Sequence, residues 1–235
     1  PELAQEYREL SALLREVGQL AEVQRKRYSE IRATATPLIL RSVHAVCTTC
    51  SAAGDSSMLP FSFRFVLIDE SGRSMEPESI IPVCLGAHQL VLVGDHKQIG
   101  PTVTDRGLAA SGLSTSLFER LILSGHPHVM LAIQYRMHPS ISCYPSQAFY
   151  EGKLVDGVTA AERTPVVPDG VTLPQPWDAP VSFVSSTMPE HYDTSRSFSN
   201  AGEVEVVVGL ISQLLSVGVG AIPLSTIAVI TGYSA

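Results

Sequence analysis

The sequence has few cysteines, few charges and no long apolar run. Its 235 residues include 4 cysteines, and Asp, Glu, Lys and Arg together make up 17%. Four cysteines are too few for a disulfide framework, so we expect a reducing intracellular compartment, cytoplasmic or nuclear. No run of about 18 apolar residues occurs, so we predict no membrane span. The net charge of −7 excludes a uniformly basic DNA-coating protein, although a local basic groove stays compatible with it.

Two of the cysteines, Cys47 and Cys50, form a C-x-x-C pair. A structural zinc site would need four ligands, and no second Cys pair or His pair follows. A redox pair of the thioredoxin type would open a helix, whereas this pair lies in an apolar, β-branched run. We therefore expect cysteines buried in or beside a strand. A metal or redox protein centred on this pair is the alternative, and bound zinc or a titratable thiol pair would support it.

The sequence also lacks the glycine-rich loop that cradles nucleotide phosphates. No G-x-x-x-x-G-K-[ST] occurs, and Gly152-Lys153 is followed by Leu154. The backbone cradle, the phosphate-binding lysine and the Mg²⁺-binding hydroxyl of such a loop are therefore not among these residues. With 45% hydrophobic residues, the chain nevertheless has the composition of a globular protein.

The arrangement of apolar residues predicts an α/β fold. The first 35 residues are charged and helix-prone, and we expect two helices divided at Gly18 and a boundary at Pro37. Beyond them, short β-branched runs alternate with helical stretches. The expected strands are residues 43–50, 65–68, 90–93, 129–133, 181–184 and 227–230. Apolar strands separated by helices predict a parallel sheet with helices on both faces.

The helices and loops expected between these strands are as follows. A short helix is expected to carry Pro77 in its first turn. Two later helices are expected at residues 114–123, with Ser114 as the N-cap, and at residues 201–215, with Asn200 as the N-cap. A further helix is expected at residues 139–150. Residues 155–180 and 186–198 are predicted to be surface loops, the first because it is rich in proline.

Acidic residues follow two of the predicted strands. Asp69 and Glu70 come directly after one strand, and Asp95 follows the next. Ligands of open α/β sheets bind at the carboxyl ends of strands. An apolar strand ending in Asp-Glu is the Walker B arrangement of nucleotide-hydrolysing folds, in which Asp holds Mg²⁺ and Glu polarises water. Taken alone, the pair could equally be a strand that ends in a polar turn.

Three segments together resemble superfamily 1 helicases of the up-frameshift, nonsense-decay branch (the DNA2/NAM7 type). Residues 66–71 contain the D-E-x-x motif, residues 93–101 read G-D-x-x-Q-x-x-P, and residues 134–139 read Q-Y-R-M-H-P. Residues 47–55, 116–121 and 149–154 also fit. The resemblance covers the chain from about Thr34 onward and implies a RecA-like P-loop NTPase fold, with ATP and Mg²⁺ as cofactors.

The resemblance assigns roles at the nucleotide. Asp69 would hold Mg²⁺ through water, and Glu70 would orient or activate the attacking water. Gln98 is similar to a γ-phosphate sensor, because its amide can both donate to phosphate and accept from water. Arg136 resembles an arginine finger, whose planar guanidinium suits the dispersed charge of the γ-phosphoryl group. Tyr135 would lie near the base or ribose; its alternative role is in the core.

The resemblance also implies single-stranded RNA or DNA as a partner, and protein regulators as further partners. Thr48, Thr49 and Pro101 would lie on the nucleic-acid side. The implied domains are a helical segment of residues 1–35 at the end of an insertion, an incomplete first lobe of residues 36–133, and the start of a second lobe, residues 134–235. Since the chain begins at Pro1 and lacks the phosphate loop, we expect a fragment of an ATP-dependent helicase that is inactive alone. The alternative is a non-catalytic helicase-like scaffold that binds nucleic acid or protein.

Overall fold

The computed structural model describes residues 2–164, 172–192, 197–217 and 222–233. These fall into two units, residues 1–128 and residues 129–235, each of which is described by itself. Parts of the two predicted loops, at residues 165–171 and 193–196, lie outside the described residues.

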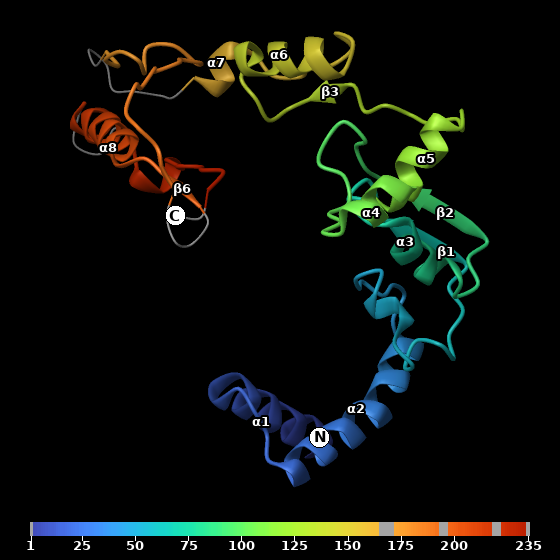
Figure 1. Ribbon diagram of the computed structural model, residues 1–235. Helices are drawn as coiled ribbons and strands as arrows, with labels where there is room; N and C mark the ends of the chain where they lie inside the picture. Colours follow the sequence, from blue (N-terminus) through green and yellow to red (C-terminus); the bar gives the residue numbers. More distant parts are fainter. Residues whose placement is uncertain (1, 165–171, 193–196, 218–221, 234–235) are drawn as a thin grey trace. The chain divides into compact units, whose positions relative to one another are not determined.

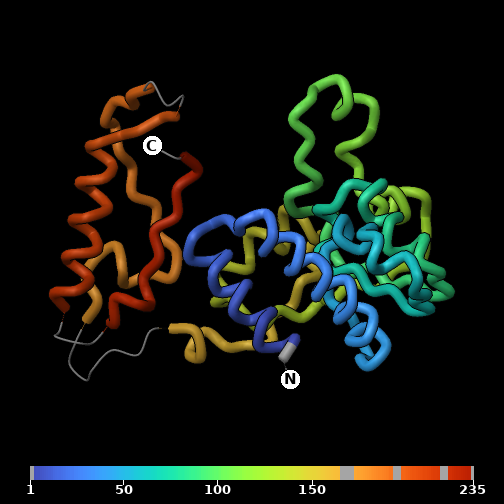
Figure 2. The backbone as a smooth tube through the Cα atoms, turned by 90° about the horizontal axis from the view of Figure 1, so that it is seen from below, coloured from blue at the N-terminus to red at the C-terminus, as the bar shows by residue number. Residues whose placement is uncertain are grey.

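The first unit begins with a helical hairpin, formed by α1 (Glu2–Val17) and α2 (Glu22–Ser42), which is visible in the backbone trace (Figure 2). The predicted break at Gly18 is confirmed, and its N–H donates to Leu14 O at 3.0 Å to end α1. Across the hairpin the rings of Tyr7 and Tyr28 stack with centroids 5.2 Å apart. Arg27 adds a fork of two hydrogen bonds to the carboxylate of Glu6.

The boundary predicted at Pro37 is wrong, because α2 continues through it to Ser42. Proline removes one N–H and so leaves the carbonyl four residues earlier without its helical donor. That carbonyl belongs to Ala33, which is exposed, so water can satisfy it.

A parallel pair of strands forms the sheet of the first unit (Figure 1). Strands β1 (Phe65–Ile68) and β2 (Gln89–Leu92) pair in register from Phe65↔Gln89 to Ile68↔Leu92. Helix α3 (Glu76–Val83) connects them and carries proline in its first turn, as predicted. This parallel crossover places both carboxyl ends at one edge of the pair.

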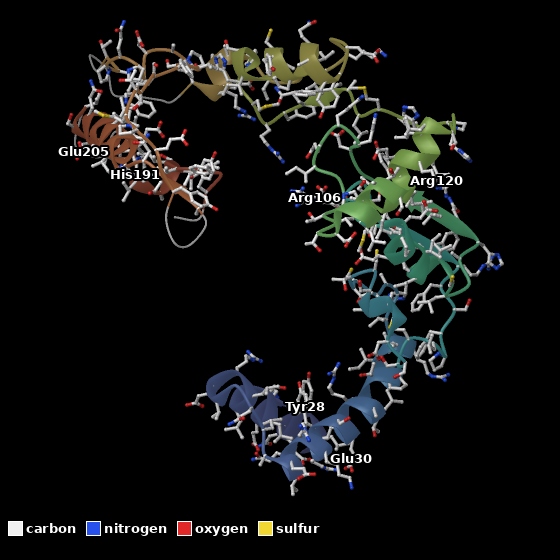
Figure 3. All side chains as sticks on the ribbon, viewed as in Figure 1. Tyr28, Glu30, Arg106, Arg120, His191 and Glu205 are labelled. Carbon is white, nitrogen blue, oxygen red and sulfur yellow. The ribbon has the colours of Figure 1, made fainter. Side chains whose placement is uncertain are left out.

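A loop and a short helix follow β2. The short helix α4 (Arg106–Leu108) continues into a π-helical segment, η2 (Ala109–Leu113). Helix α5 then spans Leu117–Leu123. Its cap is Ser116 rather than the predicted Ser114, because Ser116 Oγ accepts from Glu119 N at 3.1 Å. Arg120 of α5 forms a two-pronged ion pair with Glu76 of α3, at 2.6 and 2.7 Å (Arg120 is labelled in Figure 3).

The second unit contains two short strand pairs and three helices among its described residues. Strands β3 (Ile133–Gln134) and β4 (Val155–Asp156) are parallel, and β5 (His191–Tyr192) and β6 (Phe198–Ser199) are antiparallel. The helices are α6 (Pro139–Phe149), α7 (Ala160–Arg163) and α8 (Ala201–Ser216), and a 3₁₀ turn, η3, covers Leu224–Thr226. Asn200 caps α8 as predicted, accepting from Glu203 N at 3.1 Å.

Several predicted strands are absent from the described residues. Residues 43–50, 181–184 and 227–230 carry no strand, and η1 (Ala52–Gly54) follows the first of them. The strand predicted at residues 129–133 is reduced to β3. The side chains of Val129, Phe183 and Ile230 are at least 90% exposed. Strand propensity reflects packing against neighbours, and these runs have no ladder partner within the described part of the chain.

The start of the predicted surface loop at residues 155–180 is also corrected, because β4 and α7 occupy residues 155–163. The Thr159 hydroxyl caps α7 by accepting from Glu162 N at 3.4 Å. The α/β class is confirmed by the two parallel strand pairs and their connecting helices. Within the described residues, every helix is too short or too polar to cross a membrane.

Candidate functional site

The predicted acidic motifs lie side by side at the carboxyl ends of β1 and β2. Hydrogen bonds continue past the strands: Val93 N donates to Ile68 O at 2.9 Å, and Ser71 N donates to Val93 O at 2.8 Å. Ser71 Oγ donates to the same carbonyl at 2.8 Å, and its side chain is fully buried. The loop that carries Asp69 and Glu70 is therefore fastened to the loop that carries Asp95 and Gln98.

Two glycines allow these loops to touch. A Cβ at Gly72 would lie 2.9 Å from Asp95 O, and a Cβ at Gly94 would lie 2.8 Å from Gly72 N. Both neighbours are backbone atoms, which do not swing aside as the end of a side chain does. The close approach of the two main chains thus depends on the absence of a side chain at both positions.

Glu70 holds a strained backbone conformation at this edge. Its φ is +52°, in the left-handed region that non-glycine residues rarely adopt. Asp69 Oδ1 accepts from Glu70 N at 3.0 Å, and Glu70 O accepts from Arg73 N at 2.9 Å, which closes the turn. Both carboxylate residues are exposed. Strain of this kind persists only where surrounding contacts enforce it, and it gathers at functional sites.

Asp95 orders the second loop around Gln98. Its carboxylate accepts from Lys97 N at 2.9 Å through Oδ1 and from Gln98 Nε2 at 2.9 Å through Oδ2. The amide orientation of Gln98 follows from this bond, since a carboxylate accepts only from the nitrogen end. The structure therefore brings Asp69, Glu70 and Gln98 to one edge of the same strand pair.

The donor set at this edge suits a hydrated magnesium ion. Mg²⁺ is commonly held by one or two carboxylates together with waters and substrate phosphates. Asp69 supplies an exposed carboxylate directly at the strand end. Within the described residues no group of three or more His, Cys, Asp or Glu is placed to hold a metal by itself.

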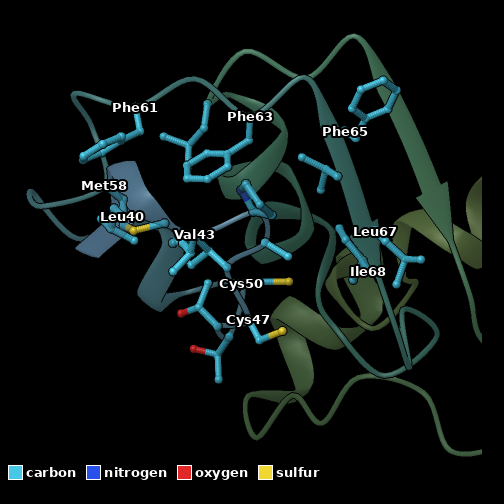
Figure 4. A pocket seen from close by; sticks show the side chains of 18 of the residues that line it. Leu40, Val43, Cys47, Cys50, Met58, Phe61, Phe63, Phe65, Leu67 and Ile68 are labelled. Atoms are coloured by element: carbon cyan, nitrogen blue, oxygen red, sulfur yellow. The ribbon is translucent and has the colours of Figure 1, made fainter. Parts of the chain in front are cut away.

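A pocket of about 830 Å³ lies between residues 43–50 and β1 (Figure 4). Thr48 and Thr49, predicted on the nucleic-acid side, line it together with Asp69. Most of its other lining is apolar. Pro101, predicted on the same side, is buried at the start of the loop after Gln98.

The two cysteines of the C-x-x-C pair differ in exposure. Both line the pocket, but Cys47 is exposed and Cys50 is partly buried. Burial raises the pKa of the Cys50 thiol, which disfavours the reactive thiolate. The prediction of cysteines buried in or beside a strand is wrong for Cys47, which is exposed, and the strand predicted at residues 43–50 does not form.

Arg136 and Tyr135 lie in the second unit, on the loop between β3 and α6. Tyr135 is 61% exposed, so the alternative prediction that it lies in the core is wrong. Arg136 is exposed as well. His138 is buried and caps α6, accepting from Ser140 N through Nδ1 at 3.0 Å.

Side chains around this loop were missed by the sequence reasoning. Gln134 Nε2 donates to Asp156 Oδ1 at 2.6 Å, and Ser142 Oγ donates to the same oxygen. These bonds lower the pKa of Asp156, with Ser142 contributing most. Arg163 donates to the carbonyls of Tyr135 and Arg136. Asp156 and Arg163 fall in the segment predicted to be a loop, and their spacing carries no recognisable motif.

Two family models match the chain, both described as an AAA domain. One covers residues 2–106 and the other covers residues 113–235. The second match alone includes more than half of the chain.

Curated relatives match nearly the whole chain. It is 41% identical over 231 residues to a regulator of nonsense transcripts 1 homolog of Neurospora crassa, covering 96% of this chain and 21% of that protein. It is 41% identical over 213 residues to the ATP-dependent helicase upf1 of Schizosaccharomyces pombe, covering 89% and 23%. It is 47% identical over 159 residues to the ATP-dependent helicase NAM7 of Saccharomyces cerevisiae, covering 68% and 16%. The chain thus spans about a fifth of the length of these relatives.

Proposed function

The chain belongs to the AAA-domain family of superfamily 1 helicases of the up-frameshift branch, and from this membership we propose that the intact protein is an ATP-dependent helicase. It couples ATP hydrolysis to translocation on single-stranded RNA or DNA. The whole protein's activity is inferred here from one part of it.

One observation carries the proposal more than any other. Two parallel strands end at the same edge with Asp69 and Glu70 on one and Gln98 on the other, and their loops are fastened together. Phosphoryl transfer needs charge and hydrogen-bond donors fixed in position around the phosphate. The fastened pair of loops bears a carboxylate that can hold Mg²⁺, a second carboxylate that can orient water, and an amide that can donate to phosphate, and together these meet that need.

We assign the roles at the nucleotide as follows. Asp69 holds Mg²⁺ through water, and the ion neutralises charge on the phosphates. Glu70 orients or activates the attacking water, and Gln98 senses the γ-phosphate. Arg136 supplies a guanidinium to the developing charge, and Tyr135 contacts the base or ribose.

The fold of the complete protein extends this assignment. We propose that residues 36–133 belong to a first RecA-like lobe, with residues 1–35 as the end of a helical insertion. Residues 134–235 begin the second lobe. We propose that the complete lobe has a parallel sheet with helices on both faces and that further strands of the intact protein complete this sheet. Those strands would pair with the predicted strand segments whose side chains are exposed in this chain.

The proposed nucleic-acid side includes Thr48, Thr49 and Pro101. Two hydroxyls at the rim of a pocket suit phosphate oxygens, which accept hydrogen bonds without regard to base sequence. Protein regulators are further proposed partners, since relatives are named regulators of nonsense transcripts.

The test is ATP turnover by the intact protein, with and without single-stranded RNA or DNA. We expect turnover that single strands stimulate. Glu70→Gln should abolish turnover while leaving nucleotide binding intact, because the amide keeps the size of the side chain but loses its basicity. Full activity in this variant would remove Glu70 from the mechanism.

The same experiment addresses the alternative of a non-catalytic scaffold. An intact protein that binds single strands but neither binds nor hydrolyses ATP would overturn the enzyme assignment. The matched control is Lys153→Ala, which removes a charge from an exposed pair with Glu151 and should change neither activity.

A further inference from the structure

The side-chain amide of Gln134 is fully used in folding the loop that carries Arg136. Its Oε1 accepts from Arg136 N at 2.9 Å and from Met137 N at 2.7 Å. Its Nε2 donates to Met137 O at 2.9 Å and to Asp156 Oδ1 at 2.6 Å. An amide has two donor hydrogens and two acceptor lone pairs, so this geometry occupies all four.

Arg163 fixes the other face of the same loop. Its Nε donates to Arg136 O at 3.2 Å, and its Nη2 donates to Tyr135 O. Arg136 therefore has both of its main-chain polar groups held by side chains, the N–H by Gln134 and the carbonyl by Arg163. Its own guanidinium is left to extend from a fixed backbone.

Each of these two side chains is itself anchored. The Asp156 carboxylate in β4 accepts hydrogen bonds from Gln134 of β3 and from Ser142 of α6, so it connects these three elements. Arg163 ends α7, which is capped at the other end by Thr159 and Glu162, with Thr159 N donating to Glu162 Oε2 at 2.7 Å. The bonds that hold the loop are thus connected to secondary structure on both sides.

We propose that Gln134, Asp156 and Arg163 are positioning residues that hold the Arg136 backbone in the geometry from which its guanidinium acts. This inference rests on the proposed function, because it assigns those residues to the arginine finger. An unanchored finger must be ordered in each catalytic cycle, whereas a fixed one meets the developing charge without that entropic cost.

The chemistry of each position is specific. Glutamate in place of Gln134 would keep the two acceptors but lose both donors, and it would place a second carboxylate against Asp156. Lysine in place of Arg163 would lose the planar fork that lets two separate nitrogens, Nε and Nη2, each reach one carbonyl. Asparagine in place of Asp156 would retain an oxygen that accepts from Gln134 and Ser142.

The first measurement is the kinetics of ATP hydrolysis by the intact protein. Arg136→Ala should lower kcat by roughly 10³-fold or more, the value of an arginine finger in related hydrolases. Arg163→Ala should lower kcat by roughly 10- to 100-fold with KM for ATP unchanged, as expected for a misplaced catalytic group. Asp156→Asn should keep kcat, whereas Asp156→Ala should lower it.

A double-mutant cycle then separates positioning from a merely structural role. If Arg163 acts through Arg136, adding Arg163→Ala to Arg136→Ala should cause no further loss of kcat. A full additive loss in the double variant would overturn the proposal. Urea unfolding followed by far-ultraviolet circular dichroism, compared with wild type, confirms that each variant is folded.

A second readout needs no catalysis. Amide hydrogen exchange at Arg136 and Met137 should accelerate in Gln134→Ala, which removes the oxygen that both N–H groups donate to, and stay unchanged in Lys153→Ala. Unchanged exchange in Gln134→Ala would sink the proposal whatever the activity. If the wild-type protein does not hydrolyse ATP, the proposed function fails, but faster exchange in Gln134→Ala would still support the fixed loop.

Discussion

The two units fix their functional loops by different means. In the first unit, the loops bearing Glu70 and Gln98 are held to each other chiefly by main-chain contact, through glycines that admit no side chain and ladder bonds that continue past the strands. The Asp95 carboxylate orders the Gln98 loop itself. In the second unit, the loop bearing Arg136 is held by side chains, chiefly Gln134 and Arg163.

This difference has a physical consequence. Main-chain packing tolerates almost no substitution, but it does not depend on ionisation. Side-chain bonds tolerate isosteric replacements but respond to pH and to loss of a single donor. The first arrangement suits two loops that meet at one edge of a strand pair, and the second suits a residue that extends from a single loop. The two should therefore fail under different perturbations.

The largest effect is expected for Gly94→Ala. The new Cβ would lie 2.8 Å from Gly72 N and 3.2 Å from Ser71 N, so the backbone must move. Overpacking of this kind costs about 1–3 kcal/mol of unfolding free energy. Urea unfolding followed by far-ultraviolet circular dichroism measures it. The matched control is Gly209→Ala within α8, where nothing lies within 4 Å and a gain of about 0.5–1 kcal/mol is expected. Equal stability of the two variants would contradict the main-chain account.

A smaller effect is expected from relief of strain at Glu70. Its φ of +52° costs an ordinary residue about 1–2 kcal/mol but costs glycine nothing. Glu70→Gly and Glu70→Ala both remove the carboxylate, so the difference between their free energies of unfolding reports the cost of the backbone conformation alone. We expect the glycine variant to be more stable by about 1 kcal/mol in urea, with both inactive in ATP turnover. An alanine variant as stable as the glycine variant would show that the turn stores no strain.

The third prediction concerns a side-chain link within the first unit, the Arg120–Glu76 ion pair. Hydrogen bonding to Arg120 lowers the pKa of Glu76 below its usual 4.5. The stabilisation should therefore be complete above about pH 4.5 and be lost as pH falls through the lower folded pKa. Since both side chains are partly exposed, Glu76→Gln should cost less than about 1 kcal/mol at pH 7. Urea midpoints of variant and wild type should converge as pH falls through the lowered pKa of Glu76, and a gap that persists once this carboxyl is protonated would assign the pair a different role.

Much of this fold could be predicted from local patterns. Strands β1 and β2, the proline in the first turn of α3 and the Asn200 cap follow from runs and caps that are short in sequence. The strands predicted at residues 43–50 and 227–230 did not form, because a strand requires a partner and sequence periodicity says nothing about where that partner is. Pro37 was overestimated as a helix terminator, since the carbonyl that it leaves free is solvent-exposed.

Some residues of the candidate site could likewise be predicted from local patterns, and others could not. Asp69 and Glu70 were identified because they follow a strand, and Gln98 was identified through the resemblance of its segment to a helicase motif. The structure places all three at one edge of the strand pair. Asp156 and Arg163 were missed because their partners are distant in sequence. Asp156 accepts from the side chains of Gln134 and Ser142, and Arg163 donates to the carbonyls of Tyr135 and Arg136. A carboxylate and an arginine in a proline-rich neighbourhood give no sequence sign of what they contact.

The smallest effect should come from acidifying the side-chain arrangement of the second unit. Hydrogen bonds from Ser142 and Gln134 lower the pKa of Asp156 below its usual 3.8. Its contribution should be complete above about pH 4 and be lost as pH falls through the folded pKa, because the protonated carboxyl accepts less well. Asp156→Asn keeps an acceptor that does not titrate. Between pH 5 and pH 2.5, the urea midpoint reported by Trp177 fluorescence should therefore fall further for wild type than for Asp156→Asn. Asp156→Ala should start lower and show the shallow slope of the asparagine variant. Parallel slopes in wild type and Asp156→Asn would mean that the Gln134 amide holds its loop without help from the carboxylate.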